Sequence, residues 1–121
     1  LHELRRLCEG RAAVKPPTPV EINAALKPIA AHIADFGVFN FCLSNGQVMW
    51  AHCSTQLYFI VREHPFTTAH LLDTDVLIDF ANHTTPDDRV AVIATAPLTD
   101  NEVWYKMLKN ESMMFVNGHP L

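Results

Sequence analysis

The stretch GVFNFCLSNGQVMWAHCSTQLYFIVR, residues 37–62, decides the fold because it reads as three consecutive antiparallel strands. Asn45-Gly46 stands between two apolar runs, and this dipeptide tolerates the positive φ angles of a two-residue type I′ hairpin turn. Residues 38–43 are therefore expected to pair with residues 47–52. A third run, residues 57–62, follows after a short polar segment.

Both faces of the predicted hairpin are apolar. In the first strand, one face carries Phe39, Phe41 and Leu43, and the other face carries Val38, Asn40 and Cys42. In the second strand, one face carries Val48 and Trp50, and the other face carries Met49 and Ala51. An antiparallel strand with one solvated face alternates apolar and polar residues, which these strands do not. We therefore expect this sheet to be covered on both faces, by another sheet, by helices, or by one of each.

Two helices are predicted before these strands, over residues 1–10 and 18–36. The first is short and amphipathic and has Gly10 where a glycine would end it. The second begins with a capping box, because Thr18 can cap the helix and Glu21 follows three residues later. Its apolar stripe is Ile22, Leu26, Ile29, Ile33 and Phe36, and Gly37 closes it. Because the first residue, Leu1, already lies in the helical pattern without a cap, we expect further chain upstream.

The rest of the chain reads as short strands, so residues 37–121 are mainly antiparallel strand and the class is α+β. Two strand candidates, residues 69–72 and 76–80, follow a turn. Residues 90–95 are β-branched and apolar on both faces, which predicts a central strand. Residues 101–108 form a helical turn or an edge segment anchored by Trp104, and residues 112–116 form a last strand.

Composition excludes several classes of function. A chain of 121 residues with 49% hydrophobic and 18% charged residues has the size and character of one globular domain. The net charge is −4 and the nine Lys and Arg are dispersed, so we expect no nucleic-acid or membrane partner. The apolar runs are shorter than the ~20 residues of a membrane-spanning helix, and we expect a cytoplasmic protein. Cys8, Cys42 and Cys53 form no C-x-x-C pair, so reduced thiols are expected.

One local cluster, His52-Cys53-Ser54-Thr55, invites a catalytic interpretation, because a thiolate beside an imidazole is a plausible nucleophile and base. Neighbours in a strand point to opposite faces, however, so His52 and Cys53 cannot meet there. We therefore expect no catalytic residue in this cluster.

No metal or cofactor is expected either. The seven histidines, at positions 2, 32, 52, 64, 70, 83 and 119, show no short ligand spacing. Asp73, Asp75 and Asp79 lack the glycine and glutamate of a calcium loop and are expected to end strands and solvate a turn. Trp104, close to Glu102, is expected to be a packing anchor, and there is no glycine-rich phosphate loop.

Three segments, in this order, resemble the C-terminal half of the class II glutamine amidotransferase-like proteins of the YafJ type, which are N-terminal-nucleophile hydrolases. They are GVFNFCLSNGQVMWAHCSTQLYFIVREHPF, LLDTDVLIDF and TTPDDRVAVIATAPLTDNEVWYKM. The most specific pieces are the hairpin, Cys53-Ser54-Thr55, and residues 94–99 followed by Glu102 and Trp104. Many relatives carry an acidic residue where this chain has Ala96.

The resemblance implies a four-layer αββα sandwich of two antiparallel sheets, of which residues 1–121 form an incomplete C-terminal portion. It implies hydrolysis of glutamine or a γ-glutamyl amide by an N-terminal cysteine upstream of Leu1. No catalytic position of the family carries over: Asn45-Gly46 is a hairpin turn and not the oxyanion pair, and Cys8 is not terminal. The partners implied are the missing N-terminal half and a small amide substrate.

The resulting expectation is that this chain is the scaffold half of an amidohydrolase, inactive by itself and prone to self-association. One alternative is a self-contained α+β ligand-binding or sensor module without catalysis, whose sheet holds a ligand against the helix over residues 18–36. Another is a small hydrolase that uses Cys53, which requires a His or Asp across the sheet.

Overall fold

Two helices open the chain in the computed structural model, which describes residues 2–9 and 15–121. Helix α1 spans His2–Glu9 and α2 spans Pro19–Ala34. The expected glycine end of the first helix, Gly10, lies outside the described residues, as do Leu1 and the side chain of Cys8. No helix among the described residues has the length and apolar character needed to cross a membrane.

The capping box of α2 is confirmed. The Thr18 side chain accepts from the backbone N of Glu21 at 3.3 Å, and Oε2 of Glu21 accepts from the backbone N of Thr18 at 2.8 Å. Leu26 and Ala30 are the buried residues of the helix. The helix ends two residues earlier than predicted, so Phe36 lies beyond it and is 80% exposed, and its assignment to the apolar stripe was wrong.

All strand pairings are antiparallel and form three sheets. The first sheet has the order β1-β2-β8-β9, with β1 at Phe41–Ser44, β2 at Met49–Cys53, β8 at Glu111–Val116 and β9 at His119–Pro120. The second has the order β6-β3-β7, with β6 at Arg89–Ala94, β3 at Tyr58–Glu63 and β7 at Tyr105–Lys106. A hairpin of β4, Thr68–Leu71, and β5, Val76–Asp79, is the third, and the 3-10 helix η1, Phe80–Asn82, follows it.

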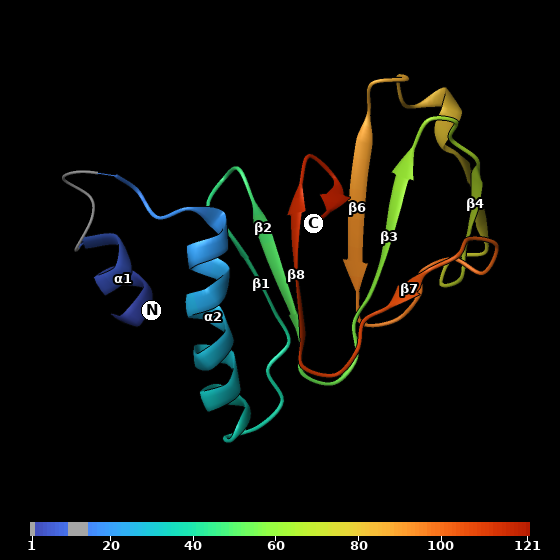
Figure 1. Ribbon diagram of the computed structural model, residues 1–121. Coiled ribbons are helices and arrows are strands. Elements are labelled where there is room, and N and C mark those ends of the chain that lie inside the picture. Colours follow the sequence, from blue (N-terminus) through green and yellow to red (C-terminus); the bar gives the residue numbers. More distant parts are fainter. Residues whose placement is uncertain (1, 10–14) are drawn as a thin grey trace.

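These elements stack in layers (Figure 1): α2, then the four-stranded sheet, then the three-stranded sheet, with the β4–β5 hairpin on the far side. On the helix side, Trp50 of β2 and Val48, the residue just before β2, pack with Leu26 of α2. Between the sheets lies a second cluster of buried residues, Ala51, Cys53, Leu57, Phe59, Met107 and Phe115. β2 is thus covered by a helix on one face and a sheet on the other, as expected. For β1 the expectation was wrong, because Cys42 and Ser44, on its face away from the helix, are exposed.

The first hairpin is confirmed, but its turn lies one residue later than predicted. Ser44 pairs with Met49, and the backbone N of Asn45 donates to O of Val48 at 3.2 Å, so Gly46 and Gln47 are the central residues. Gly46 has φ +89° and Asn45 does not have a positive φ. A glycine with positive φ at the first central position is the pattern of a type II′ turn, so the type I′ prediction was wrong.

The strand over residues 90–95 was predicted to be central, but among the described residues β6 pairs with β3 alone and so lies at an edge of the three-stranded sheet. Ala91 and Ile93 pack into the cluster between the sheets. Their neighbours Val90 and Val92 therefore face the outer side, where Val90 is 47% exposed. Apolarity on both faces of this strand therefore showed neither that both faces are buried nor that the strand lies in the middle of its sheet. Of the two alternatives for residues 101–108, the edge segment is correct, as β7.

Candidate functional site

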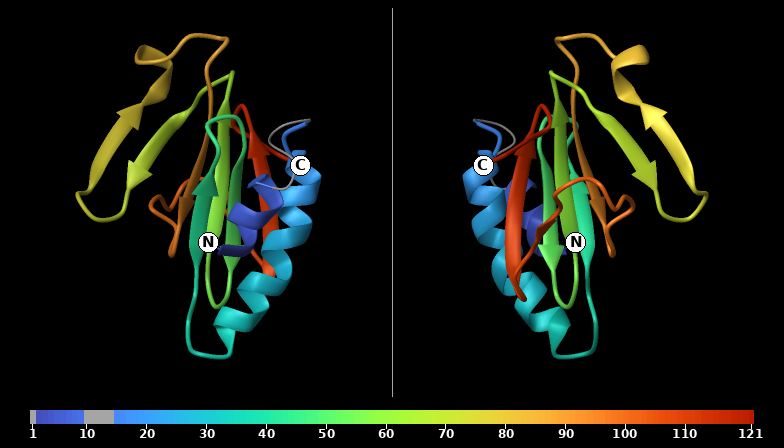
Figure 2. Two further views of the ribbon diagram at one scale, coloured as in Figure 1. Left: turned by 90° about the vertical axis from the view of Figure 1, so that its left-hand side faces the viewer. Right: turned by 90° about the vertical axis from the view of Figure 1, so that its right-hand side faces the viewer.

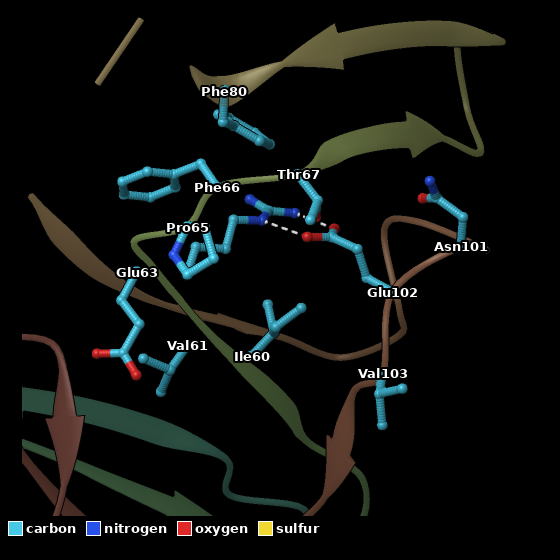
Figure 3. Close-up of a pocket in the computed structure, with 11 residues that line it drawn as sticks. Ile60, Val61, Glu63, Pro65, Phe66, Thr67, Phe80, Asn101, Glu102 and Val103 are labelled. Carbon is cyan, nitrogen blue, oxygen red and sulfur yellow. Dashed lines mark hydrogen bonds and ion pairs between the residues drawn. The ribbon is translucent and has the colours of Figure 1, made fainter. Parts of the chain in front are cut away.

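A pocket of about 300 Å³ opens on the outer side of the three-stranded sheet. Figure 3 shows that β3, the segment after it, η1 and the loop before β7 supply its walls. Its lining consists of Ile60, Val61, Arg62, Glu63, Pro65, Phe66, Thr67, Phe80, Asn101, Glu102 and Val103. Because strand residues alternate, Arg62 points to this outer face while Val61 packs toward the core between the sheets.

Arg62 and Glu102, both in the lining of this pocket, form a two-point ion pair, and the dashed lines at Glu102 in Figure 3 mark its hydrogen bonds. Arg62 Nε donates to Glu102 Oε1 at 2.9 Å and Nη2 donates to Oε2 at 2.6 Å. The side chains of Arg62 and Glu102 are only 13% and 8% exposed. The guanidinium carbon also lies 4.5 Å from the centroid of the Phe80 ring, a cation–π contact.

Glu102 and Trp104 were singled out in the sequence, and the structure joins them through Thr99. The indole Nε1 of Trp104 donates to Thr99 Oγ1 at 2.9 Å, and Thr99 Oγ1 in turn donates to Glu102 Oε2 at 2.7 Å. The hydrogen bonds from Arg62, with that from Thr99, hold the pKa of Glu102 below its ordinary value. Trp104 is half-buried and its indole is anchored by the hydrogen bond to Thr99, while the role of Glu102 as the acceptor for Arg62 was not predicted.

The hydrogen bonds that Arg62 and Thr99 donate to Glu102 suit this carboxylate to a structural role and not to general acid–base catalysis. Glu102 is ionised and its oxygens are engaged by Arg62 and Thr99, so it is a weak base. Among the described residues that line the pocket there is no cysteine, serine or histidine. The pair ties β3 to the loop before β7, and the pocket beside it offers aromatic and apolar contacts.

The His52-Cys53-Ser54-Thr55 cluster is divided by the strand, as expected. His52 lies on the helix side of β2, where its Nδ1 is 2.7 Å from Ser112 Oγ and its ring stacks on Phe41 at 5.3 Å between centroids. Cys53 is fully buried in the cluster between the two sheets. Ser54 and Thr55 form a turn in which their backbone N groups donate to Asn40 Oδ1.

His52 also lines a second cavity, of about 420 Å³, beside the C-terminal end of α2. Its other polar lining residues are Lys27, Asp35, Asn110 and Ser112. Burial lowers the pKa of His52, so the imidazole is kept neutral and pairs with the Ser112 hydroxyl across the strands. Sequence reading missed this pair because its members are 60 residues apart.

The histidines and aspartates form no metal centre among the residues that the structure describes. Asp79 accepts from the backbone N of Ala81 and so begins η1. Asp75 instead binds His70 Nε2 at 2.8 Å, and the other ring nitrogen, Nδ1, lies 2.9 Å from Asp100. This Asp-His-Asp arrangement was also missed, because Asp100 is 30 residues away from His70.

Comparisons with known proteins agree with one another. The family model of the class II glutamine amidotransferases matches residues 2–121. YafJ of Escherichia coli is 48% identical over 106 residues, which is 85% of this chain and 42% of YafJ. A Haemophilus influenzae protein is 43% identical over 107 residues, which is 88% of this chain and 36% of that protein. The names of both assign them provisionally to the glutamine amidotransferases.

One solved structure is similar over nearly the whole chain. It is the crystal structure of a predicted glutamine amidotransferase from Pseudomonas aeruginosa, with a TM-score of 0.71 and 40% identity. The match covers 92% of this chain but 44% of the other. This chain therefore spans less than half the length of each of these three relatives.

Proposed function

The chain belongs to the class II glutamine amidotransferase family, and from this premise we propose that it is the C-terminal scaffold half of a glutamine-hydrolysing domain. The complete domain would hydrolyse glutamine or a γ-glutamyl amide. The nucleophile would be an N-terminal cysteine upstream of this chain, with its own α-amino group as the base. The substrate and the upstream half are then the partners of these residues, in a cytoplasmic protein without a nucleic-acid or membrane partner.

One observation carries this proposal. The two larger sheets face each other, yet α2 covers only one side of the pair, and among the described residues no α-helix covers the outer side of the three-stranded sheet (Figure 2). A four-layer αββα sandwich would supply that cover from the rest of the polypeptide. Exposed apolar area costs about 25 cal/mol per Å², so residues 1–121 alone would self-associate.

The catalytic cysteine can be located with a glutamine analogue that alkylates thiols, such as a γ-diazoketone, followed by peptide mass spectrometry of the intact protein. We expect one modified cysteine upstream of residue 1 and release of ammonia from glutamine by the unmodified protein. The Cys53→Ala and Cys42→Ala variants serve as matched controls and should keep the activity. Modification at Cys53, together with loss of activity in Cys53→Ala, would instead establish a hydrolase that uses Cys53.

A second experiment tests whether glutamine hydrolysis requires the upstream half in addition to residues 1–121. Residues 1–121, purified alone, should show no glutaminase activity and should scatter light as an oligomer. Co-expression with the upstream half should give a soluble complex that regains activity. An intact mass of 13.6 kDa for the native protein, or a monodisperse and inactive monomer of residues 1–121, would favour the self-contained binding module.

A further inference from the structure

The β4–β5 hairpin is fastened to the rest of the molecule mainly by the loop before β7, residues 97–104. The backbone N of Leu72 donates to O of Leu98 at 3.0 Å, and Leu71 forms an isolated β-bridge with Thr99. Asn101 accepts from the backbone N of His70 at 2.8 Å and donates to O of Thr68 at 2.9 Å. Figure 2 shows the hairpin standing away from both larger sheets, so these contacts set its position.

The same two segments form opposing walls of the Arg62–Glu102 pocket. Phe66 and Thr67 precede β4 and Phe80 follows β5, and they line one side (Figure 3). Asn101 and Glu102 of the loop line the other side. The width of the pocket therefore depends on how closely the hairpin is held to the loop.

His70 makes the one charged contact between hairpin and loop that the described residues show. Its Nδ1 lies 2.9 Å and 3.0 Å from the two carboxylate oxygens of Asp100 in the loop. Its Nε2 lies 2.8 Å from Asp75, in the turn of the hairpin itself. An ionised carboxylate only accepts hydrogen bonds, so His70 can make hydrogen bonds to both carboxylates at once only when both ring nitrogens carry a proton, as in the imidazolium.

Among the described residues, His70 has no charged partner besides Asp75 and Asp100. Asp79 of β5 is committed to η1, where it accepts from Ala81 and Asn82. Asp73 lies in the same turn as Asp75 and adds negative charge. Arg62, which lines the pocket, forms its ion pair with Glu102. The charges that face His70 from hairpin and loop are therefore negative.

We propose that His70 is a proton-controlled clamp: when protonated it holds the β4–β5 hairpin against Asp100 and keeps the Arg62–Glu102 pocket narrow, and when it loses the proton the pocket widens. A neutral imidazole has one N–H, so it can donate to only one of the two carboxylates, and it no longer carries the charge that both attract. The contacts of Leu72 and Asn101 remain, so the hairpin loosens without detaching. This clamp is separate from the proposed glutamine hydrolysis.

The sign of the pH dependence follows from linkage. The hydrogen bonds with Asp75 and Asp100 raise the pKa of His70 above its ordinary value of 6.5. The clamped state therefore binds the proton more tightly than the open state, so the clamp is fully held below pH 6.5 and is lost as the pH rises through the raised pKa. Because one proton is involved, the opening equilibrium constant can rise up to tenfold per pH unit within that window.

Hydrogen exchange of the intact protein measures the opening. Amides of residues 68–79 would be followed from pH 5.5 to 9, and their rates divided by intrinsic rates to remove the chemical pH dependence. In the wild type we expect protection of these amides to fall with rising pH, while that of β2 and β3 stays constant. His70→Gln should lose this pH dependence and be open throughout. His83→Gln, at an exposed histidine after η1, is the matched control and should behave as wild type.

Asp75→Asn separates the clamp from a purely structural role. It leaves Asp100 in place but removes one source of the raised pKa, so the loss of protection should persist and move to lower pH. An NMR titration of the His70 ring should report the same shift. A His70 pKa at or below 6.5 in the wild type would overturn the clamp, as would hairpin protection in His70→Gln that still falls with pH. Neither readout depends on whether the protein hydrolyses glutamine.

Discussion

Arg62 of β3 and Glu102 in the loop before β7 meet in a parallel two-point ion pair, with Nε 2.9 Å from Oε1 and Nη2 2.6 Å from Oε2. Thr99 adds a third hydrogen bond to the carboxylate at 2.7 Å. Because this loop also carries Trp104 and the contacts to the β4–β5 hairpin, the pair joins the three-stranded sheet to everything on its outer side.

Replacing Glu102 with glutamine should destabilise the intact protein by roughly 3 kcal/mol, because it leaves the Arg62 charge buried without a counter-ion. The matched control is Glu63→Gln, since Glu63 also accepts from an arginine, Arg89, at 2.8 Å but is 47% exposed. An exposed pair contributes about 1 kcal/mol or less, so the control should be nearly neutral. Urea unfolding at pH 7 measures both variants, and equal costs would contradict the structural role of Glu102.

The acid stability of the protein should also depend on Glu102. Arg62 and Thr99 hold its pKa below the ordinary value of 4.5, so the unfolded chain takes up this proton first as the pH falls. The stabilisation is therefore fully present above about pH 4.5 and is lost as the pH falls through the lowered pKa. The urea midpoint of the wild type should drop more steeply between pH 5 and pH 3 than that of Glu102→Gln. Parallel curves would rule out this contribution.

Local patterns in the sequence were enough to predict the start of α2 and the cover on both faces of β2. The capping box needs only Thr18 and Glu21, and the double-sided apolarity of β2 reports that both of its faces are buried. The same pattern in β1 did not predict that Cys42 is exposed. The turn was misplaced because the Asn45 side chain accepts from the backbone N of Gln47 and Val48, and so moves the reversal one residue onward. Dipeptide preference alone does not contain that contact.

Strand order and the side-chain clusters could not be predicted from the sequence. The apolar faces of β6 look the same whether one or two neighbours pair with its backbone, so they could not show that β6 is an edge. Arg62 and Glu102 are 40 residues apart, and His70 and Asp100 are 30 apart. Pairs at such separations are made by the fold and leave no local spacing pattern to recognise.

Gly118 should be the less replaceable of two glycines with positive φ. It has φ +77°, and an added Cβ would lie 2.9 Å from Arg89 Cγ and 3.0 Å from Arg89 O. Gly46 has φ +89° and open space around it, so it serves as the matched control. Gly46→Ala should cost about 1 kcal/mol for backbone strain alone, and Gly118→Ala about 1–3 kcal/mol more, because β9 must shift from β6. Thermal unfolding of both variants checks this order, and a larger loss for Gly46→Ala would contradict it.

His52 should affect stability with the opposite pH sign to His70. Burial under α2 lowers the pKa of His52 below its ordinary value of 6.5, so between those two values the unfolded chain binds this proton and the folded chain does not. The stability that neutral His52 provides is thus present above about pH 6.5 and declines below it, at no more than about 1.4 kcal/mol per pH unit.

Glutamine at this position can still pair with the Ser112 hydroxyl but cannot be protonated. The difference in unfolding free energy between wild type and His52→Gln should therefore move against the wild type as the pH falls from 7.5 to 5.5. His83→Gln, at an exposed histidine after η1, is the matched control and is measured over the same pH range. Because His70 is present in both members of each comparison, its own titration cancels. A wild-type advantage that grows toward acid pH would mean that His52 is protonated in the folded protein, and that it donates to Ser112 as an imidazolium.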